Sequence, residues 1–178
     1  MRTLLALLAL ALPAAAQDRQ GNDTPGDWIV EHTKHFGLWD SLCDHRMTGE
    51  MRESRCYLRY VDVFSPRPKF GAVFLFVTPE PQVQIGLEPG TVFAPNGIRI
   101  EQGGQTTWDD VKLTCLVGLN CTFTEDRARA LIAAMAKGGH FAFDFTDRHG
   151  ARQERRWDLS QFADALADYR ARTAERRL

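Results

Sequence analysis

Four cysteines are the residues of this chain whose types and spacing say most about its chemistry: Cys43, Cys56, Cys115 and Cys121. Four cysteines allow three disulfide pairings, and sequence alone does not choose among them. We predict local pairing, Cys43 with Cys56 and Cys115 with Cys121, because the first pair would close a hairpin-sized loop and the second would join a strand to a helix. Zinc binding is the alternative, but intervals of 12 and 5 residues do not match the usual zinc knuckles.

The amino-terminal residues have the pattern of a secretory signal. Residues 1–16 carry one positive charge, an apolar stretch and small residues before a cleavage site after Ala16. The apolar stretch is shorter than the roughly 20 residues that span a bilayer. We therefore expect a signal peptide over 1–16, a flexible leader over 17–26 and a single domain over 27–178. An exported protein reaches an oxidising compartment, which agrees with disulfides, and we expect a periplasmic or secreted protein.

Carboxylates and imidazoles close to the first cysteine form the second group that could do chemistry. Asp40, Asp44 and His45 could make a cluster for hydrolysis or metal binding. The simpler interpretation, which we favour, is a solvated loop. On a strand, His32 and His35 would point to opposite faces and could not share one metal without a bend.

Other catalytic patterns are weak in this sequence. Asp144, Asp147 and His149 could bind a metal, but Asp147 and His149 fit turn chemistry equally well. The serines occur in neither G-x-S-x-G nor S-x-x-K, and the chain has no H-E-x-x-H and no phosphate-binding loop. We expect a non-enzyme with no catalytic residue, cofactor or metal; a small hydrolase or periplasmic ligand-binding module is the alternative.

The charge distribution excludes a general nucleic-acid binder and singles out the carboxyl-terminal end. The formal net charge is −1 at pH 7, whereas nucleic-acid binding needs clustered basic excess. Residues 148–178 nevertheless contain eight arginines and five acidic residues. Arginines at the end of the last helix would complement its negative terminus, or would make a weak peripheral contact with an anionic surface. The candidate residues are Arg170, Arg172, Arg176 and Arg177.

These residues must be positioned by short apolar segments separated by glycine and proline. We expect strands over 28–33, 56–64, 71–78, 83–87, 97–101 and 111–117. Residues 71–77 of the third segment include no polar position, so this segment is expected to be a central strand. The spacing predicts a mainly β fold, an antiparallel β-sandwich with two α-helices, with α+β as the alternative.

The first helix is expected to begin at a capping box, Thr122 to Glu125, and to end at Gly138 and Gly139. Its apolar positions follow the helical period of three and four residues. We expect them to face the core.

The carboxyl-terminal third begins with a hairpin. Residues 141–145 alternate strictly and 152–157 form the return strand, with a turn between them. Ser160 is expected to cap a final helix whose apolar stripe leaves Asp164, Asp168, Arg170 and Arg172 largely off the buried face. The four tryptophans are expected to pack in the core or at sheet edges rather than bind a ligand.

The layout resembles the invasion-associated locus B family. The resemblance rests on Trp39-Asp-Ser-Leu-Cys43-Asp44, on Cys56 opening a strand, on the turn at Glu88-Pro89-Gly90, on Cys115 and Cys121 before a helix, and on a closing Leu-Ser-Gln-Phe. It covers most of the chain after the signal. It implies a small, mainly β, exported envelope protein, associated in some members with host-cell invasion, and it implies no catalytic residue.

Overall fold

A computed structural model describes residues 27–64, 71–77, 81–87, 94–110, 120–147 and 149–178. The signal peptide, the leader, Cys115 and the strand expected over 111–117 lie outside these residues. In the described part no helix is long and apolar enough to cross a membrane.

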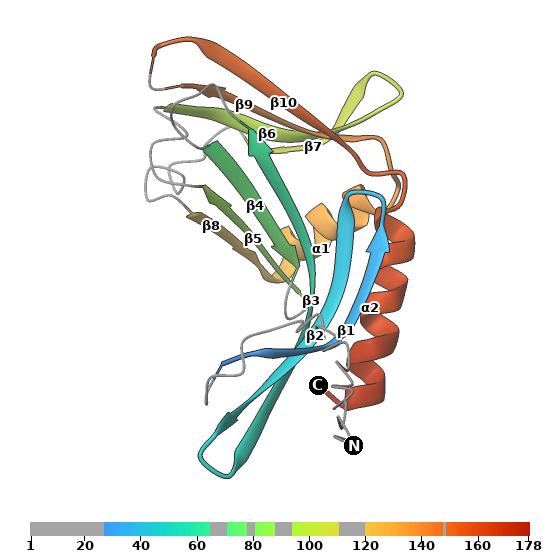
Figure 1. Ribbon diagram of the computed structural model, residues 1–178. Helices are drawn as coiled ribbons and strands as arrows, with labels where there is room; N and C mark the ends of the chain where they lie inside the picture. The colour runs from blue at the N-terminus through green and yellow to red at the C-terminus, as the bar shows by residue number, and fades with distance from the viewer. Residues whose placement is uncertain (1–26, 65–70, 78–80, 88–93, 111–119, 148) are drawn as a thin grey trace, which may run out of the picture.

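The described residues form two antiparallel sheets and two helices (Figure 1), so the expectation of a mainly β fold is confirmed. The larger sheet has six strands in the order β1-β2-β3-β4-β5-β8. Their bounds are β1 Ile29–Phe36, β2 Trp39–Thr48, β3 Met51–Phe64, β4 Gly71–Val77, β5 Gln82–Leu87 and β8 Asn120–Thr124. β4 lies between β3 and β5, which confirms that this apolar segment is a central strand.

The smaller sheet has four strands in the order β10-β9-β6-β7. Its strands are β6 Ala94–Gln102, β7 Gln105–Asp110, β9 His140–Thr146 and β10 Arg152–Asp158. The pairing of β9 with β10 confirms the expected hairpin. Its turn is held by Asp147, whose carboxylate accepts hydrogen bonds from the backbone of His149 and Ala151.

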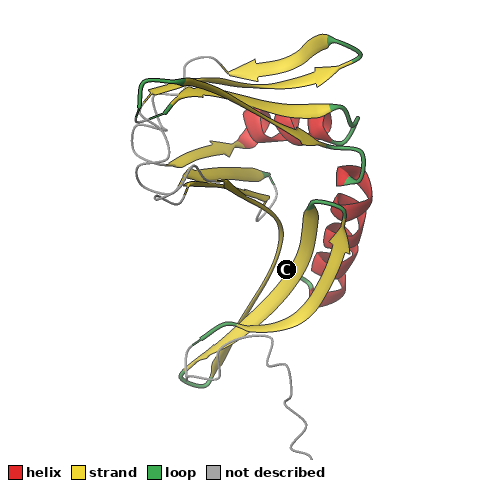
Figure 2. Cartoon of the chain, turned by 45° about the horizontal axis from the view of Figure 1, so that its top comes forward, coloured by secondary structure: helices red, strands yellow, loops and turns green. Residues whose placement is uncertain are grey.

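One helix lies between the two sheets, and the other lies along the β1–β3 part of the large sheet (Figure 2). α1, Glu125–Met135, packs against β5 and β8 of one sheet and β7 of the other, and α2, Phe162–Arg176, packs against β1, β2 and β3. Trp39 is buried at the centre of the second contact, with its ring 4.8 Å from that of Phe162 and 5.6 Å from that of Tyr60. The side of the large sheet that meets α2 and the small sheet is its inner face, and the opposite side is its outer face.

Both expected helix starts were wrong in detail. Thr122 belongs to β8, and the cap of α1 is Thr124, which makes no side-chain capping bond. Ser160 does not cap α2, because Gln161 holds that position and the Ser160 hydroxyl donates to Asp158 instead, at 2.7 Å. The expected end of α1 is confirmed, since the chain leaves the helix through two glycines with positive φ.

Candidate functional site

The base of the β2–β3 hairpin is joined covalently. Cys43 and Cys56 face each other across the two strands and form a disulfide, as predicted. Both are buried on the inner face. Cys121 is also disulfide-bonded, and no described cysteine is free; Cys115, the partner predicted for Cys121, lies outside the described residues.

A buried carboxylate lies one residue beyond this disulfide, on the outer face. Asp44 is 2% exposed and accepts two hydrogen bonds from the Arg55 guanidinium, at 2.7 and 3.1 Å. The Tyr57 hydroxyl donates a third bond to it at 3.0 Å. Burial, together with the charge and the hydrogen bond of Asp44, raises the pKa of Tyr57. The geometry is that of a bidentate arginine–carboxylate pair.

An aromatic ring covers the arginine of this pair. The Arg55 guanidinium lies 3.6 Å from the ring centroid of Trp28, and Arg46 lies 4.7 Å from the same ring. Arg46 in turn binds Glu53 on the neighbouring strand at 2.7 Å. Cation–π contacts of this kind are worth about 0.5–1 kcal/mol at exposed sites and more when desolvated. Trp28 therefore packs over Arg46 and Arg55 on the outer face of the hairpin.

The other acidic and imidazole side chains near Cys43 are paired separately. Asp40 binds His35 at 2.6 Å and Arg59 at 2.9 Å. His45 lies on the inner face, 3.2 Å from Glu31. The expectation of a solvated loop was wrong, because Asp40, Asp44 and His45 belong to a strand whose alternation places His45 on the face opposite to Asp40 and Asp44. Among the described residues, no group of three or more His, Cys, Asp or Glu side chains could hold a metal ion.

His32 points to the opposite face from His35, as predicted, and there it holds α2. Its Nε2 lies 2.8 Å from Asp168, and Lys34 lies 3.7 Å from the same carboxylate. Burial tends to raise the pKa of Asp168, but the hydrogen bond from His32 and the charges of His32 and Lys34 outweigh it, so this pKa is lowered. The expectation that Asp168 lies off the buried face was wrong: its side chain is only 8% exposed.

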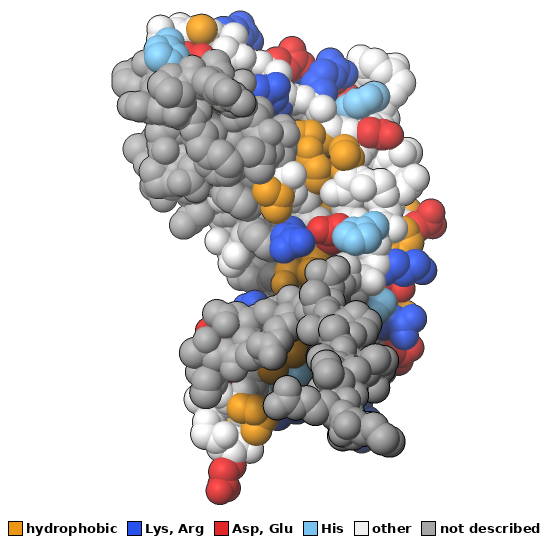
Figure 3. All heavy atoms as spheres, viewed as in Figure 1, with side chains coloured by type: hydrophobic (Ala, Val, Ile, Leu, Met, Phe, Trp, Pro, Cys, Tyr) orange, Lys and Arg blue, Asp and Glu red, His pale blue; other side chains and the backbone are white. Residues whose placement is uncertain are grey.

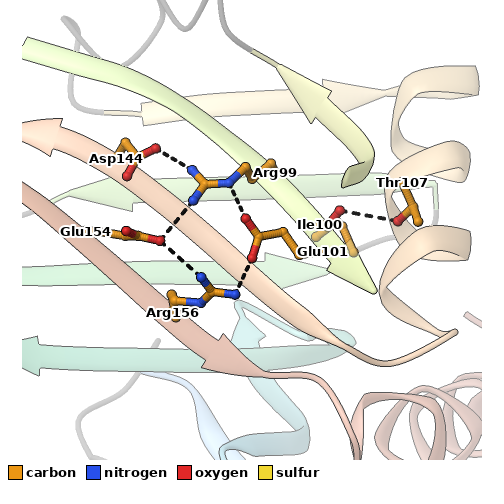
Figure 4. A network of polar contacts seen from close by, with 7 residues as sticks. All are labelled: Arg99, Ile100, Glu101, Thr107, Asp144, Glu154 and Arg156. Atoms are coloured by element: carbon orange, nitrogen blue, oxygen red, sulfur yellow. Dashed lines mark hydrogen bonds and ion pairs between the residues drawn. The ribbon is translucent and has the colours of Figure 1, made fainter. Parts of the chain in front are cut away.

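A third polar cluster covers the outer side of the small sheet (Figure 4). Arg99 of β6 lies at its centre, bound to Asp144 of β9, to Glu101 and, at 2.9 Å, to Glu154 of β10. Arg156 closes the network by binding Glu101 and Glu154. The hydrogen bond from Arg99 is the main reason why the pKa of Glu101 is lowered. The network holds three strands together across their solvent side.

The arginines proposed from the sequence for an anionic surface differ in the contacts they make on α2. Arg172 is bound to Glu175 at 2.7 Å and lies 3.8 Å from Asp168. Arg176 donates to the Arg172 carbonyl at 3.3 Å, which fits the helix-end role. Arg177 forms the left-handed carboxyl-terminal cap of α2, and Arg170 is an exposed residue of the same helix.

Sequence reasoning singled out Asp44 but missed its partners. Arg55 and Tyr57 become neighbours of Asp44 only through the β2–β3 register. Glu154 likewise meets Arg99, and Arg156 meets Glu101, across β9. A sequence signal existed for the small sheet only, where alternating charges mark the solvent side of β10.

Comparisons with known proteins found similarity only among solved structures. No known family matches the sequence, and no curated protein matches it. The crystal structure of invasion associated protein B from Bartonella henselae is similar, with 16% sequence identity and a TM-score of 0.48. The similarity covers 81% of this chain and 99% of that chain.

Proposed function

We propose that this protein is a non-catalytic, exported envelope protein that binds another protein through the free end of its β2–β3 hairpin. The observation that carries the proposal is the hairpin itself. It projects away from the small sheet (Figure 1) and is closed at its base by a disulfide.

The free end of the hairpin exposes apolar side chains that the fold does not use. Met51 is 67% exposed and Met47 is 45% exposed. Hydrophobic atoms are visible on the surface of this end of the molecule in Figure 3. Methionine is flexible and polarisable, so it adapts well to the surface of a partner protein. The two methionines thus supply the apolar part of a small contact.

Rigidity is the second property that an exposed binding element needs. The Cys43–Cys56 disulfide and the Arg46–Glu53 pair link the two strands of the hairpin at two different distances from its free end. An element that is ordered before binding loses less conformational entropy when it binds. A disulfide persists in the oxidising compartment that the proposal requires.

The non-catalytic part of the proposal is supported by how the carboxylates near Cys43 are used. Asp44 is saturated by Arg55 and Tyr57, and Asp40 by His35 and Arg59. A hydrolase needs a carboxylate or imidazole that can reach substrate. These side chains instead hold adjacent strands together, so their replacement should reduce stability.

The binding test uses a tip variant with Met47→Ser and Met51→Ser. Leu38→Ser is the matched control, because Leu38 is 47% exposed at the other end of β2. The unchanged protein, the tip variant and the control are each immobilised in oxidised form. Each is exposed to detergent-solubilised native envelope and, separately, to solubilised host-cell membranes. A partner that is retained is then titrated against the three proteins.

Losing two half-exposed methionine contacts is expected to weaken binding about 10- to 30-fold. The Leu38→Ser variant should bind as the unchanged protein does. Equal binding by the tip variant would contradict the proposal. Retention of an envelope protein and of a host-membrane protein are the two results that distinguish an envelope role from a host-interaction role.

A further inference from the structure

We infer that β10 is a self-association strand: two copies of this chain pair antiparallel through their β10 strands and join their small sheets into one. This inference is independent of the binding role of the β2–β3 hairpin. It starts from the position of β10, which has β9 on one side and no described strand on the other. Figure 1 shows it along the outer edge of the small sheet.

The described edge strands differ in how they are protected. β1 and β7 each pair with their neighbour through a register shift, between Val30 and His32 and between Ile100 and Glu101. Such irregularities twist an edge and prevent further pairing. At β8 the chain continues directly into α1, which packs against it. β10 pairs with β9 over seven consecutive residues without a shift, and its free edge is regular.

The charges on the solvent side of β10 are self-complementary. Arg152, Glu154, Arg156 and Asp158 alternate in sign along this side. In an antiparallel pair centred on Arg155, Arg152 faces the partner's Asp158, and Glu154 faces the partner's Arg156. Every cross-strand pair on this side is then of opposite charge, which stabilises a sheet.

Within the described part of the chain, the two outermost charges have no ion-pair partner. Glu154 and Arg156 are bound within the Arg99 network. Arg152 and Asp158 form no salt bridge with any described residue, and the hydrogen bonds that Asp158 accepts come from Ser160 and from the Leu159 backbone. These are the residues that face each other at both ends of the paired strands. The dimer thus supplies the missing partner of each.

The inner side of the strand limits the strength of this dimer. Arg155 would face the partner's Arg155, and like charges directly opposite each other are unfavourable. A contact made mostly by one strand from each copy is also small. We therefore expect a weak dimer of micromolar affinity or weaker, further weakened by salt.

Sedimentation velocity of the exported, oxidised protein over micromolar to millimolar concentrations tests the inference. The unchanged protein should dimerise, and Arg152→Glu should shift the midpoint at least tenfold to higher concentration. The double variant Arg152→Glu with Asp158→Arg keeps the original net charge and restores opposite pairs, so it should restore the dimer. A monomeric unchanged protein, or dimerisation unaffected by Arg152→Glu, would overturn the inference.

Cross-linking supplies a measurement that does not depend on Asp158, whose replacement removes its bonds to Ser160. Under mild oxidation, Arg155→Cys should form an interchain disulfide, because residue 155 faces itself. Arg152→Cys is the matched control and should not, since it lies six residues from the partner's equivalent position. Equal cross-linking of both variants would show random collision instead of the proposed register.

Discussion

Replacement of Asp44 by asparagine should destabilise the protein by about 2 kcal/mol, because the buried carboxylate serves three hydrogen bonds at once. Removing one member of a fully buried ion pair costs about 3–5 kcal/mol. The side chain of Arg55 is 45% exposed, so water can rehydrate its guanidinium, and the asparagine carbonyl retains one acceptor. Both effects lower the estimate to about 2 kcal/mol, or a melting temperature lower by roughly 4–8 °C.

Asp40→Asn is the matched control for this measurement. Asp40 also lies on β2 and binds an arginine, but its side chain is 23% exposed against 3% for Asp44. Its pairs are therefore better screened by water, and we expect a loss of at most about 1 kcal/mol. Urea unfolding of the oxidised proteins measures both values. A loss in Asp44→Asn no greater than in Asp40→Asn would refute the argument from burial.

The same substitution should change the titration of Tyr57. Burial raises the pKa of its hydroxyl, and the negative charge and hydrogen bond of Asp44 raise it further. Asparagine removes the charge, so the pKa of Tyr57 should fall towards that of an ordinary tyrosine. Absorbance of the ionised phenol, compared with Tyr57→Phe to assign the signal, follows this change. An unaltered titration would mean that the hydroxyl does not contact Asp44 in solution.

Three further predictions concern the rest of the chain. Asp168→Asn should destabilise the protein at neutral pH. Because the pKa of Asp168 is lowered in the folded protein, the stability difference between the two proteins should disappear as pH falls through that pKa, below the ordinary value of about 4. Urea unfolding of both proteins at each pH measures this difference. Peptide mapping should recover the Cys43–Cys56 link, and replacing both cysteines by alanine should cost about 2–3 kcal/mol in the same assay. Arg176→Gln with Arg177→Gln should reduce cosedimentation with anionic vesicles at low salt, and equal binding would leave these residues with a helix-end role only.

The elements that sequence predicted best are those whose hydrophobic periodicity reflects a single division between a core-facing side and the opposite side. The β9–β10 hairpin alternates because one side of each strand carries large apolar residues that meet the core and the other carries mostly polar residues, with the buried Ala142 as the exception on β9. The stripe of α2, Phe162, Leu166 and Tyr169, is buried for the same reason. Local patterns of this kind need no knowledge of the neighbouring strand.

The strands that were not predicted, β2 and β7, have polar or charged residues at positions where a strand pattern would need apolar ones. The environment of these residues becomes clear only from the pairing with the neighbouring strand. β2 contains Ser41 and Asp44, both buried, and neither belongs to an apolar alternation. β7, Gln105–Asp110, is an edge strand with only Trp108 packed against the core. Hydrophobic periodicity therefore gave no signal for them. The candidate site was predicted only in part for the same reason, since Arg55 and Tyr57 reach Asp44 from another strand.

One irregularity in β1 decides how the two faces of the large sheet are built. Trp28, His32 and Lys34 are all even-numbered, so an uninterrupted strand would place them on one face. The register instead shifts between Val30 and His32. Trp28 can therefore cover Arg55 on the outer face, while His32 and Lys34 reach Asp168 of α2 on the inner face. Because of this one-residue bulge, the β1 segment both covers the Asp44–Arg55 pair and binds α2. No local pattern in the sequence marks the position of the bulge.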